Sequence, residues 1–289
     1  MSNIRNKTAL GAIYIIFSAF FFALMGLFVQ LAGDLPSFQK SFFRNAVAAV
    51  IAFIILLKER KGFMWHKDTL PSLILRSVFG TVGVLCNFYA IDHLVLSDAL
   101  MLNKLSPFFA IIFSVLLLKE KVKPFQILMV LLAFIGSLFI IKPTPELLNP
   151  ASILGLTGGI CAGAAYTMVR KASQMGERKT YIVFFFSTFS TLILLPFVFL
   201  TYVKMTFIQL AYLLLAGICA ALCQFTITTA YSYAPANEIS LYDYTQIIFS
   251  TLMSLVVFNV LPDAYSFTGY FIIISATIIM FIKNKRKMA

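Results

Sequence analysis

The sequence predicts an all-α membrane protein of ten transmembrane helices, arranged as two inverted five-helix repeats. Three observations favour this fold class. The 289 residues are 61% hydrophobic and 12% charged, whereas soluble domains are about half apolar and a quarter charged. The apolar residues form runs of about 20, the length at which a helix crosses a bilayer. In addition, the second half of the chain repeats features of the first half.

We expect each of ten apolar runs to form one helix. The breaks between the runs contain turn-forming or charged residues, as in Gly33 to Pro36 and Lys58 to Asp68, and the weakest break is Ala234 to Ala236. The first run is too long for the core of a signal peptide, so we expect it to be retained. The predicted helices are 8–32, 36–57, 70–91, 97–118, 124–141, 151–170, 180–202, 207–231, 237–258 and 265–282.

The distribution of Lys and Arg predicts the orientation, because these residues accumulate on the cytoplasmic side of membrane proteins. With the N-terminus inside, seventeen of them fall on the inner side and three, Lys40, Lys142 and Lys204, on the outer side. We therefore expect a multi-pass protein of the cell membrane with both termini in the cytoplasm. The same distribution explains the net charge of +12, so we expect no nucleic-acid partner.

The two halves of the chain align with each other. The run that starts at Gly11 resembles the run that starts at Gly155, and a shift of 139 residues places Lys104 on Asp243. Five spans in each half is an odd number, so the halves enter the membrane in opposite directions. We expect repeats at 1–145 and 146–289, with equivalent residues close together near the middle of the membrane.

Lys104 and Asp243 are the charged residues that most require an explanation. Each lies about 10 Å inside its predicted helix, where an unpaired charge is costly. One interpretation is a buried ion pair that joins the helices at 97–118 and 237–258. The other is a watery cavity, in which Lys104 contacts a substrate carboxylate or phosphate and Asp243 contacts a substrate ammonium or a coupling proton. A pair that opens when substrate arrives would combine the two as a gate.

Other charged residues within the predicted helices have more ordinary explanations. Arg44 lies about eight residues inside its helix, and a structural anchor and a contact to a substrate anion both remain open. Arg76 and Arg170 are near helix ends, so we expect them to reach the cytoplasmic interface. Asp98 and Glu238 are in the first turn of their helices and are expected to cap them.

Polar and aromatic side chains gather around these positions. Tyrosine and amide groups at this depth need partners, which a polar ligand or water can supply, although packing against lipid or core is the alternative for each aromatic ring alone. The candidate substrate-binding residues are therefore Lys104, Asp243, Arg44, Asn87, Tyr89, Asn103, Tyr166, Tyr242 and Gln246.

Small residues recur in two of the predicted helices. Gly155, Gly159 and Gly163 are spaced four residues apart, and Gly80 and Gly83 lie in the third predicted helix. Small residues allow helices to approach closely in membranes, and they also permit the sliding that alternating access requires. Close packing is the simpler expectation.

No group of residues predicts catalysis, so we expect the protein not to be an enzyme and to need no cofactor. Cys219 and Cys223 share a helix face, but no His, Asp or Glu is in register with them. We therefore expect buried small residues rather than metal ligands. The chain contains no P-loop, which argues against ATP-driven pumping.

Three stretches resemble the EamA branch of the drug/metabolite transporter superfamily. They are SFFRNAVAA, which contains Arg44, then RSVFGTVGVLCNFYAIDHLVLSDA and NKLSPFFAIIFSVLLLKEKVKPFQ, which contains Glu120. The resemblance covers nearly the whole chain. It implies ten helices in two inverted halves, a central cavity, and gradient-driven movement of small metabolites, often outward. The second half departs from the family pattern, because Asn259 or Val260 stands where Glu120 does in the first.

The resemblance and the membrane charges together predict a secondary active transporter. We expect it to export a small polar or zwitterionic metabolite, an amino acid or a related compound, by alternating access. The middle stretch is most similar to members that export amino acids or take up S-adenosylmethionine. Uptake of S-adenosylmethionine or a nucleotide-like metabolite, or a role as a non-transporting membrane subunit, are the alternatives. The expected partners are the substrate and membrane lipid, with a coupling proton left open, and the expected state is a monomer or weak dimer.

Overall fold

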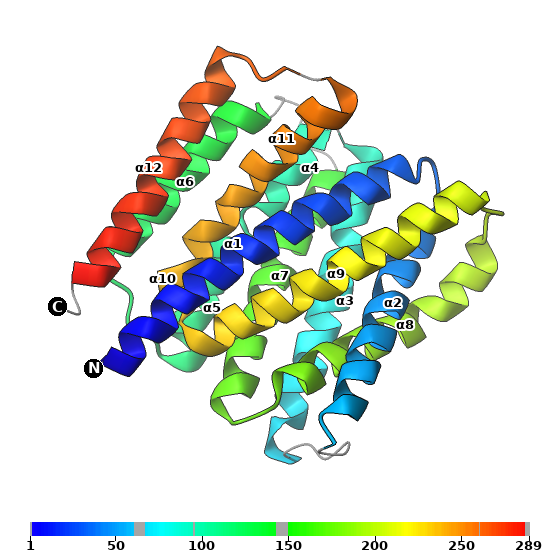
Figure 1. Ribbon diagram of the computed structural model, residues 1–289, viewed down its shortest axis with the longest axis horizontal. Helices are drawn as coiled ribbons and strands as arrows, with labels where there is room; N and C mark the ends of the chain where they lie inside the picture. The colour runs from blue at the N-terminus through cyan, green and yellow to red at the C-terminus, as the bar shows by residue number, and fades with distance from the viewer. Residues whose placement is uncertain (1, 61–66, 95, 143–149, 260, 287–289) are drawn as a thin grey trace.

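The computed structural model describes residues 2–60, 67–94, 96–142, 150–259 and 261–286, and side chains are described for most of these. Throughout the described residues the regular structure is helical (Figure 1). The first half contains α1 Ser2–Leu31, α2 Ser37–Lys58, η1 Lys67–Thr69, α3 Leu70–His93, α4 Leu96–Asn103, α5 Ser106–Leu118 and α6 Pro124–Ile141. The second half contains α7 Pro150–Gln174, α8 Lys179–Thr201, α9 Phe207–Tyr233, α10 Ala236–Ile239, η2 Ser240–Tyr244, α11 Thr245–Phe258 and α12 Ala264–Arg286.

These elements form ten helices that are long and apolar enough to cross a membrane. Their limits agree with the predicted runs to within about one turn of helix, because the loops carry the charge and turn residues that end each run. The fold class is therefore confirmed as an all-helical, multi-pass membrane protein. The predicted boundary between the repeats, at 145/146, lies outside the described residues.

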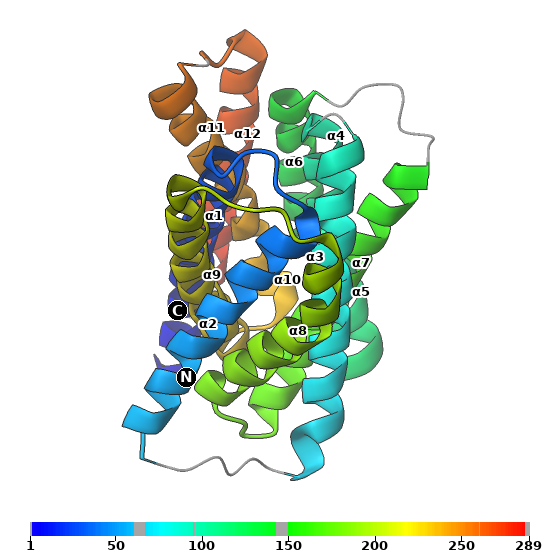
Figure 2. The same cartoon turned by 90° about the vertical axis from the view of Figure 1, so that its right-hand side faces the viewer.

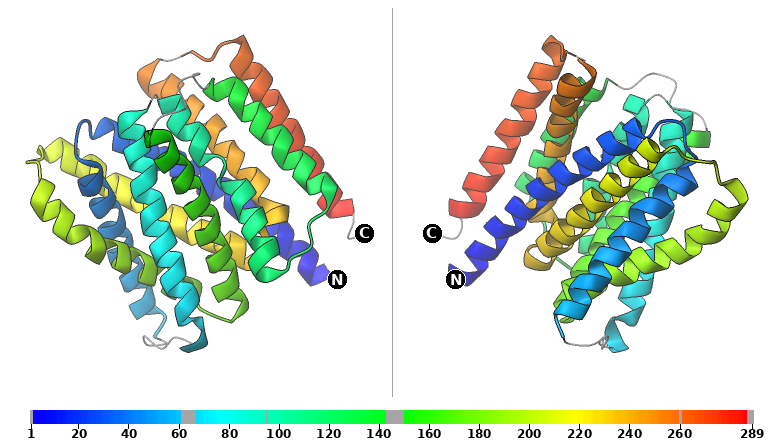
Figure 3. Two further views of the ribbon diagram at one scale, coloured as in Figure 1. Left: turned by 180° about the vertical axis from the view of Figure 1, so that it is seen from behind. Right: turned by 45° about the vertical axis from the view of Figure 1, so that its right-hand side comes forward.

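Each main pair of packed helices joins one helix of the first half to one helix of the second half. α1 packs along α9. In the same way α7, the counterpart of α1 in the second half, packs along α3, the counterpart of α9 in the first half. α2 packs on its own counterpart α8, and α6 on its counterpart α12. Figure 2 shows α2 and α8 on one face of the bundle, and Figure 3 shows the α6–α12 pair at the opposite edge. Both chain ends lie on one side of the bundle, called here the terminus side.

Two of the spans are interrupted helices, whereas the apolar runs of the sequence predict continuous ones. In the fourth span, α4 ends at Asn103 and α5 begins at Ser106. Pro107 explains the break, because its ring has no N–H and crowds the carbonyl four residues earlier. The ninth span starts with α10 and the 3₁₀ turn η2 before α11 continues it. The two interruptions occupy corresponding places in the two repeats.

The glycines of α7 fit this helix tightly against the interrupted span. A Cβ atom at Gly159 would lie 2.7 Å from the Leu102 carbonyl oxygen, and one at Gly163 would lie 2.6 Å from the Ala110 nitrogen. Neither position has room for a larger side chain. The expectation of close helix packing is confirmed, and it fixes the interrupted α4–α5 segment at the centre of the bundle.

Candidate functional site

A buried ion pair joins the two interruptions. The Lys104 ammonium donates to the Asp243 carboxylate at 2.9 Å, to the Asp243 carbonyl at 3.2 Å and to the Gln246 side-chain oxygen at 2.5 Å. Lys104 is 1% exposed. An ammonium has three N–H donors, so all of them are used. In this conformation the structure shows the paired arrangement of the two residues.

The irregular backbone around the pair is satisfied by the opposite repeat. The hydroxyl of Tyr244, in η2, donates to the Lys104 carbonyl at 2.9 Å, at the point where α4 gives way to α5. Tyr242, from the same turn, is 2% exposed. Non-helical backbone is tolerated inside a membrane only where protein or water supplies its hydrogen bonds. The interruptions are therefore built as one unit across the two halves.

Two buried arginines lie elsewhere in the centre of the bundle. Arg44 of α2 is 3% exposed, and its Nε donates to the Met25 sulfur of α1 at 3.1 Å. Arg76 of α3 is also 3% exposed, and its Nη2 donates to the Gln224 side-chain oxygen of α9 at 2.9 Å. The guanidinium carbon of Arg76 lies 3.9 Å from the centre of the Phe186 ring. Both arginines therefore contact neutral groups on neighbouring helices.

The prediction that Arg76 reaches the cytoplasmic interface is wrong. Gly80, one turn further along α3, leaves space for the side chain to lie inward along its own helix. A Cβ atom at Gly80 would be 2.1 Å from Arg76 Nη1 and 2.6 Å from a ring carbon of Phe186. The Arg-x-x-x-Gly spacing in the sequence was the signal that could have identified Arg76 as a central residue.

Tyr166 of α7 is partly buried. Its ring stacks on Tyr231 of α9, with centroids 5.1 Å apart and planes inclined by 14°. Among the other candidate residues, Asn87 and Asn103 are partly exposed. Tyr89 is 41% exposed and stacks on His93 at the end of α3.

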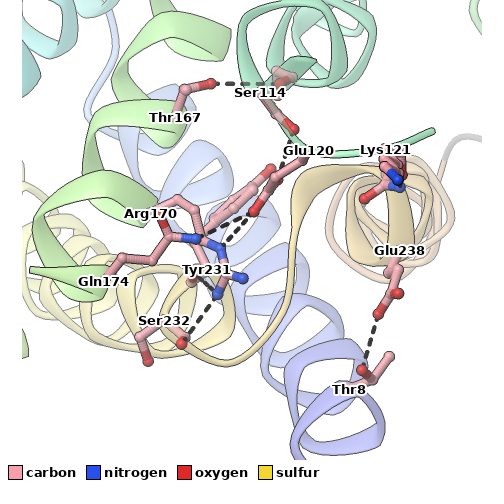
Figure 4. Close-up of polar contacts among 12 residues, drawn as sticks. Thr8, Ser114, Glu120, Lys121, Thr167, Arg170, Gln174, Tyr231, Ser232 and Glu238 are labelled. Atoms are coloured by element: carbon pink, nitrogen blue, oxygen red, sulfur yellow. Dashed lines mark hydrogen bonds and ion pairs between the residues drawn. The ribbon is translucent and has the colours of Figure 1, made fainter. Parts of the chain in front are cut away.

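A second polar cluster lies on the terminus side, in the connection after α5 (Figure 4). The Glu120 carboxylate accepts from the Ser114 hydroxyl at 2.7 Å, from Arg170 Nε at 3.0 Å and from Gln174 at 3.4 Å. Arg170 Nη1 also donates to the carbonyls of Tyr231 and Ser232, at 3.2 and 3.3 Å. The cluster therefore ties α5, α7 and α9 together.

One expectation stays a prediction and one is corrected at this end of the bundle. Arg170, which is expected to reach the interface, bonds Glu120 of the connection after α5 and two carbonyl groups of α9. Glu238 was expected to cap its helix, but its carboxylate instead accepts from the Thr8 hydroxyl of α1 at 2.9 Å (Figure 4). The side chain of Asp98, for which a cap was also expected, lies outside the described residues.

The sequence matches the family described as "EamA-like transporter family" twice, over residues 9–142 and over residues 149–282. The "Pseudopaline exporter CntI" of Pseudomonas aeruginosa (strain UCBPP-PA14) is 30% identical over 272 residues, which cover 93% of this chain and 94% of that protein. The "Riboflavin transporter" of Vibrio cholerae is 27% identical over 288 residues, covering 94% and 93%. These names are those of transporters rather than enzymes.

A solved crystal structure has the same fold. It superposes with a TM-score of 0.81 and covers 93% of this chain and 96% of that one, at 14% sequence identity. At this level of identity the similarity concerns the fold alone. The matched family, the similar transporters and the shared fold agree with the ten-span bundle described above.

Proposed function

The chain belongs to the EamA-like transporter family, and from this we propose that it is a secondary active transporter that works by alternating access. Its substrate in this proposal is a small polar or zwitterionic metabolite, an amino acid or a related compound. We propose the direction to be outward, as in the relative from Pseudomonas aeruginosa that is named an exporter. The proposed location is the cell membrane, with the terminus side facing the cytoplasm.

The observation that supports this function best is the ion pair between two interrupted helices. Many secondary transporters bind substrate where broken helices of two repeats meet near the middle of the membrane. Here Lys104 stands in the break between α4 and α5, and Asp243 stands in η2. A structural ion pair needs no interruption of either helix, whereas interrupted helices are typical of transporter binding sites.

The pair would act as a gate in the proposed cycle. Because Lys104 already uses its three donors, a substrate can bind it only by replacing one of its present acceptors. A substrate carboxylate would replace that of Asp243, and a substrate ammonium would then satisfy Asp243. Arg44, Tyr166 and Tyr242 are proposed as further contacts, and the exchange of partners would couple binding to movement of the two repeats.

The test is solute flux into proteoliposomes that contain the full chain. Thermal shifts with amino acids, nucleosides and polyamines would select the solute. We expect the Lys104→Ala variant to lose transport while it still folds, and the Lys104→Ala/Asp243→Ala variant to regain stability without regaining transport. Lys142→Ala is the matched control, because it breaks an exposed ion pair to Asp263 that also links the two halves. Normal transport by Lys104→Ala would contradict the gate.

A further inference from the structure

Arg44 and Arg76 are two charged groups inside the bundle whose hydrogen-bond partners among the described residues are neutral. Ion pairs in the described part of the chain include those of Asp243, Asp263, Glu120 and Glu59, and neither arginine takes part in any of these four. The Lys104–Asp243 pair is neutral as a unit. Among the side chains that the structure describes, the centre therefore carries an excess of positive charge.

The two guanidinium groups have N–H donors that their present contacts do not use. Arg76 bonds Gln224 through one nitrogen, and its buried Nε has no hydrogen-bond partner among the described residues. Arg44 bonds a thioether sulfur, which is a weak acceptor. An arginine has five N–H donors in a rigid fork that matches a carboxylate or phosphate. Each group could therefore accept an anion without losing a strong existing bond.

The contacts of the two groups converge on neighbouring turns of α9. Met25, which Arg44 contacts, packs in one cluster with Ala220 of α9, and Ala220 lies one turn before Gln224, which Arg76 contacts. Two like charges in a buried site repel, and a bound anion would remove that repulsion. Gly80 and the Phe186 ring hold Arg76 in place, so its guanidinium is oriented before a ligand arrives.

We propose that Arg44 and Arg76 form an anion subsite, and that the transported metabolite carries a net negative charge, with at least two carboxylate or phosphate groups. This inference rests on the proposed function and narrows its substrate class. A charge inside a membrane protein is costly and marks substrate or ion pathways. A substrate with excess acidic groups neutralises the centre during the step in which the site is closed to water on both sides.

The experiment compares ligands that differ in charge but little in shape. The full chain is held in lipid nanodiscs, and its melting temperature is measured with L-glutamate, L-glutamine, citrate and O-phosphoserine. We expect the three anionic compounds to raise the melting temperature and glutamine to leave it unchanged. A stronger response to O-phosphoserine than to glutamate would assign the subsite to phosphate, and the reverse to carboxylate. Equal stabilisation by glutamine and glutamate, or none by the three anions, would overturn the proposal.

Substitution of Arg76 separates a binding role from a structural one. We expect Arg76→Gln to weaken the affinity for the stabilising anion by about tenfold or more, and Arg76→Lys to weaken it less. Without ligand, Arg76→Gln should melt no lower than the wild type, because a buried unpaired charge has been removed. A lower melting temperature without ligand, together with unchanged anion affinity, would assign Arg76 a structural role. If Arg76→Gln fails to fold, unaltered anion affinity in Arg76→Lys would count against the subsite.

The failure of this proposal can be told apart from the failure of transport. In one outcome, the wild type and Arg76→Gln transport a solute without net charge, and Lys104→Ala does not. This result would support the transport function and contradict the anion subsite. In the other outcome, anion binding depends on Arg76, but the protein transports none of the anions tested. This result would support the subsite and contradict the transport function. Lys142→Gln, which loses a positive charge at an exposed position, is the control for unspecific charge effects.

Discussion

Gly80 matters at the scale of single residues because it decides where Arg76 can lie. The side chain of Arg76 fills the space that a Cβ atom at this position would occupy, and the Phe186 ring closes the space from α8. Gly26, in α1, is the opposite case, since a Cβ atom there would meet nothing within 4 Å. The neighbours of Gly80 therefore leave room only for glycine, whereas the position of Gly26 has room for a larger residue.

We therefore expect Gly80→Ala to lower the free energy of unfolding by about 1–3 kcal/mol, the usual cost of overpacking. Gly26→Ala is the matched control in the same fold, and it should leave stability unchanged or raise it by up to about 1 kcal/mol, because alanine favours helix. Chemical unfolding in detergent micelles measures both. Equal stability of the two variants would show that Arg76 and Phe186 move aside without cost.

Residue positions were predictable from the sequence only where a symmetry argument applied. The shift of 139 residues predicted that Lys104 and Asp243 would be close, and the structure pairs them. The distance of Arg76 from the helix end predicts its depth along the helix but not the direction of its side chain. That direction depends on Gly80, Phe186 and Gln224, from three different helices.

At the scale of elements, the helix ends follow from local chemistry and the interruptions follow from tertiary context. Apolar runs and charged loops predicted the ten spans well. Pro107 marks the break of the fourth span, yet no proline lies in Ser240–Tyr244, where the 3₁₀ turn interrupts the ninth. There the irregular backbone is held by the Tyr244 and Asp243 contacts to Lys104, which belong to the other repeat. A single-sequence pattern does not contain that information.

The start of α12 offers a pH-dependent test outside the membrane. The Asp263 carboxylate caps α12 through Ser266 and pairs with Lys142, which ends α6. The hydrogen bond from Lys142 is the main cause that lowers the pKa of Asp263 from 3.8 to about 2. A lowered pKa in the folded state contributes stability that is present above pH 3.8 and disappears as the pH falls towards 2.

The wild type should therefore melt above Asp263→Asn at neutral pH, and this difference should shrink between pH 3.8 and about 2. Melting temperatures of the two proteins, taken in parallel across this range, measure it. Both side chains are 46% exposed, so we expect a small effect. A difference that stays constant as the pH falls would mean that Asp263 acts by something other than its charge.

At the scale of the whole molecule, the two ends of the bundle are closed in different ways. Glu120 and Arg170 link three helices on the terminus side. In the alignment of the halves, Arg170 corresponds to Gly26, which has no side chain to form such a link. Lys119 and Asn259 both end their helices in the left-handed conformation, with φ of 55°. The left-handed turn is thus present in both halves, while the ion pair of Glu120 with Arg170 follows the turn of the first half.

We expect Glu120→Gln to favour conformations that are open on the terminus side. Loss of an ion pair of this kind shifts an equilibrium by about 1 kcal/mol, which is about fivefold. Cys223, 1% exposed at the centre, reports the change through its rate of reaction with a thiol reagent added from the terminus side. The other three cysteines are replaced by serine.

Asp263→Asn is the control for the labelling experiment, because it removes an ion pair at the opposite end of the bundle. The rate at Cys223 should rise about fivefold in Glu120→Gln and stay at the background value in Asp263→Asn. An unchanged rate in Glu120→Gln would show that the cluster around Glu120 does not hold that side closed.

The pairing of Lys104 with Asp243 also constrains how such a chain can have arisen. The two residues occupy equivalent positions, and their charged atoms lie 2.9 Å apart. In a dimer of two identical five-helix chains, the same contact would bring together two ammonium groups or two carboxylates, which repel. The contact exists only when the two halves differ in sequence. As long as the pair is kept, neither half can form this contact with a second copy of itself, so the two halves must differ at this position.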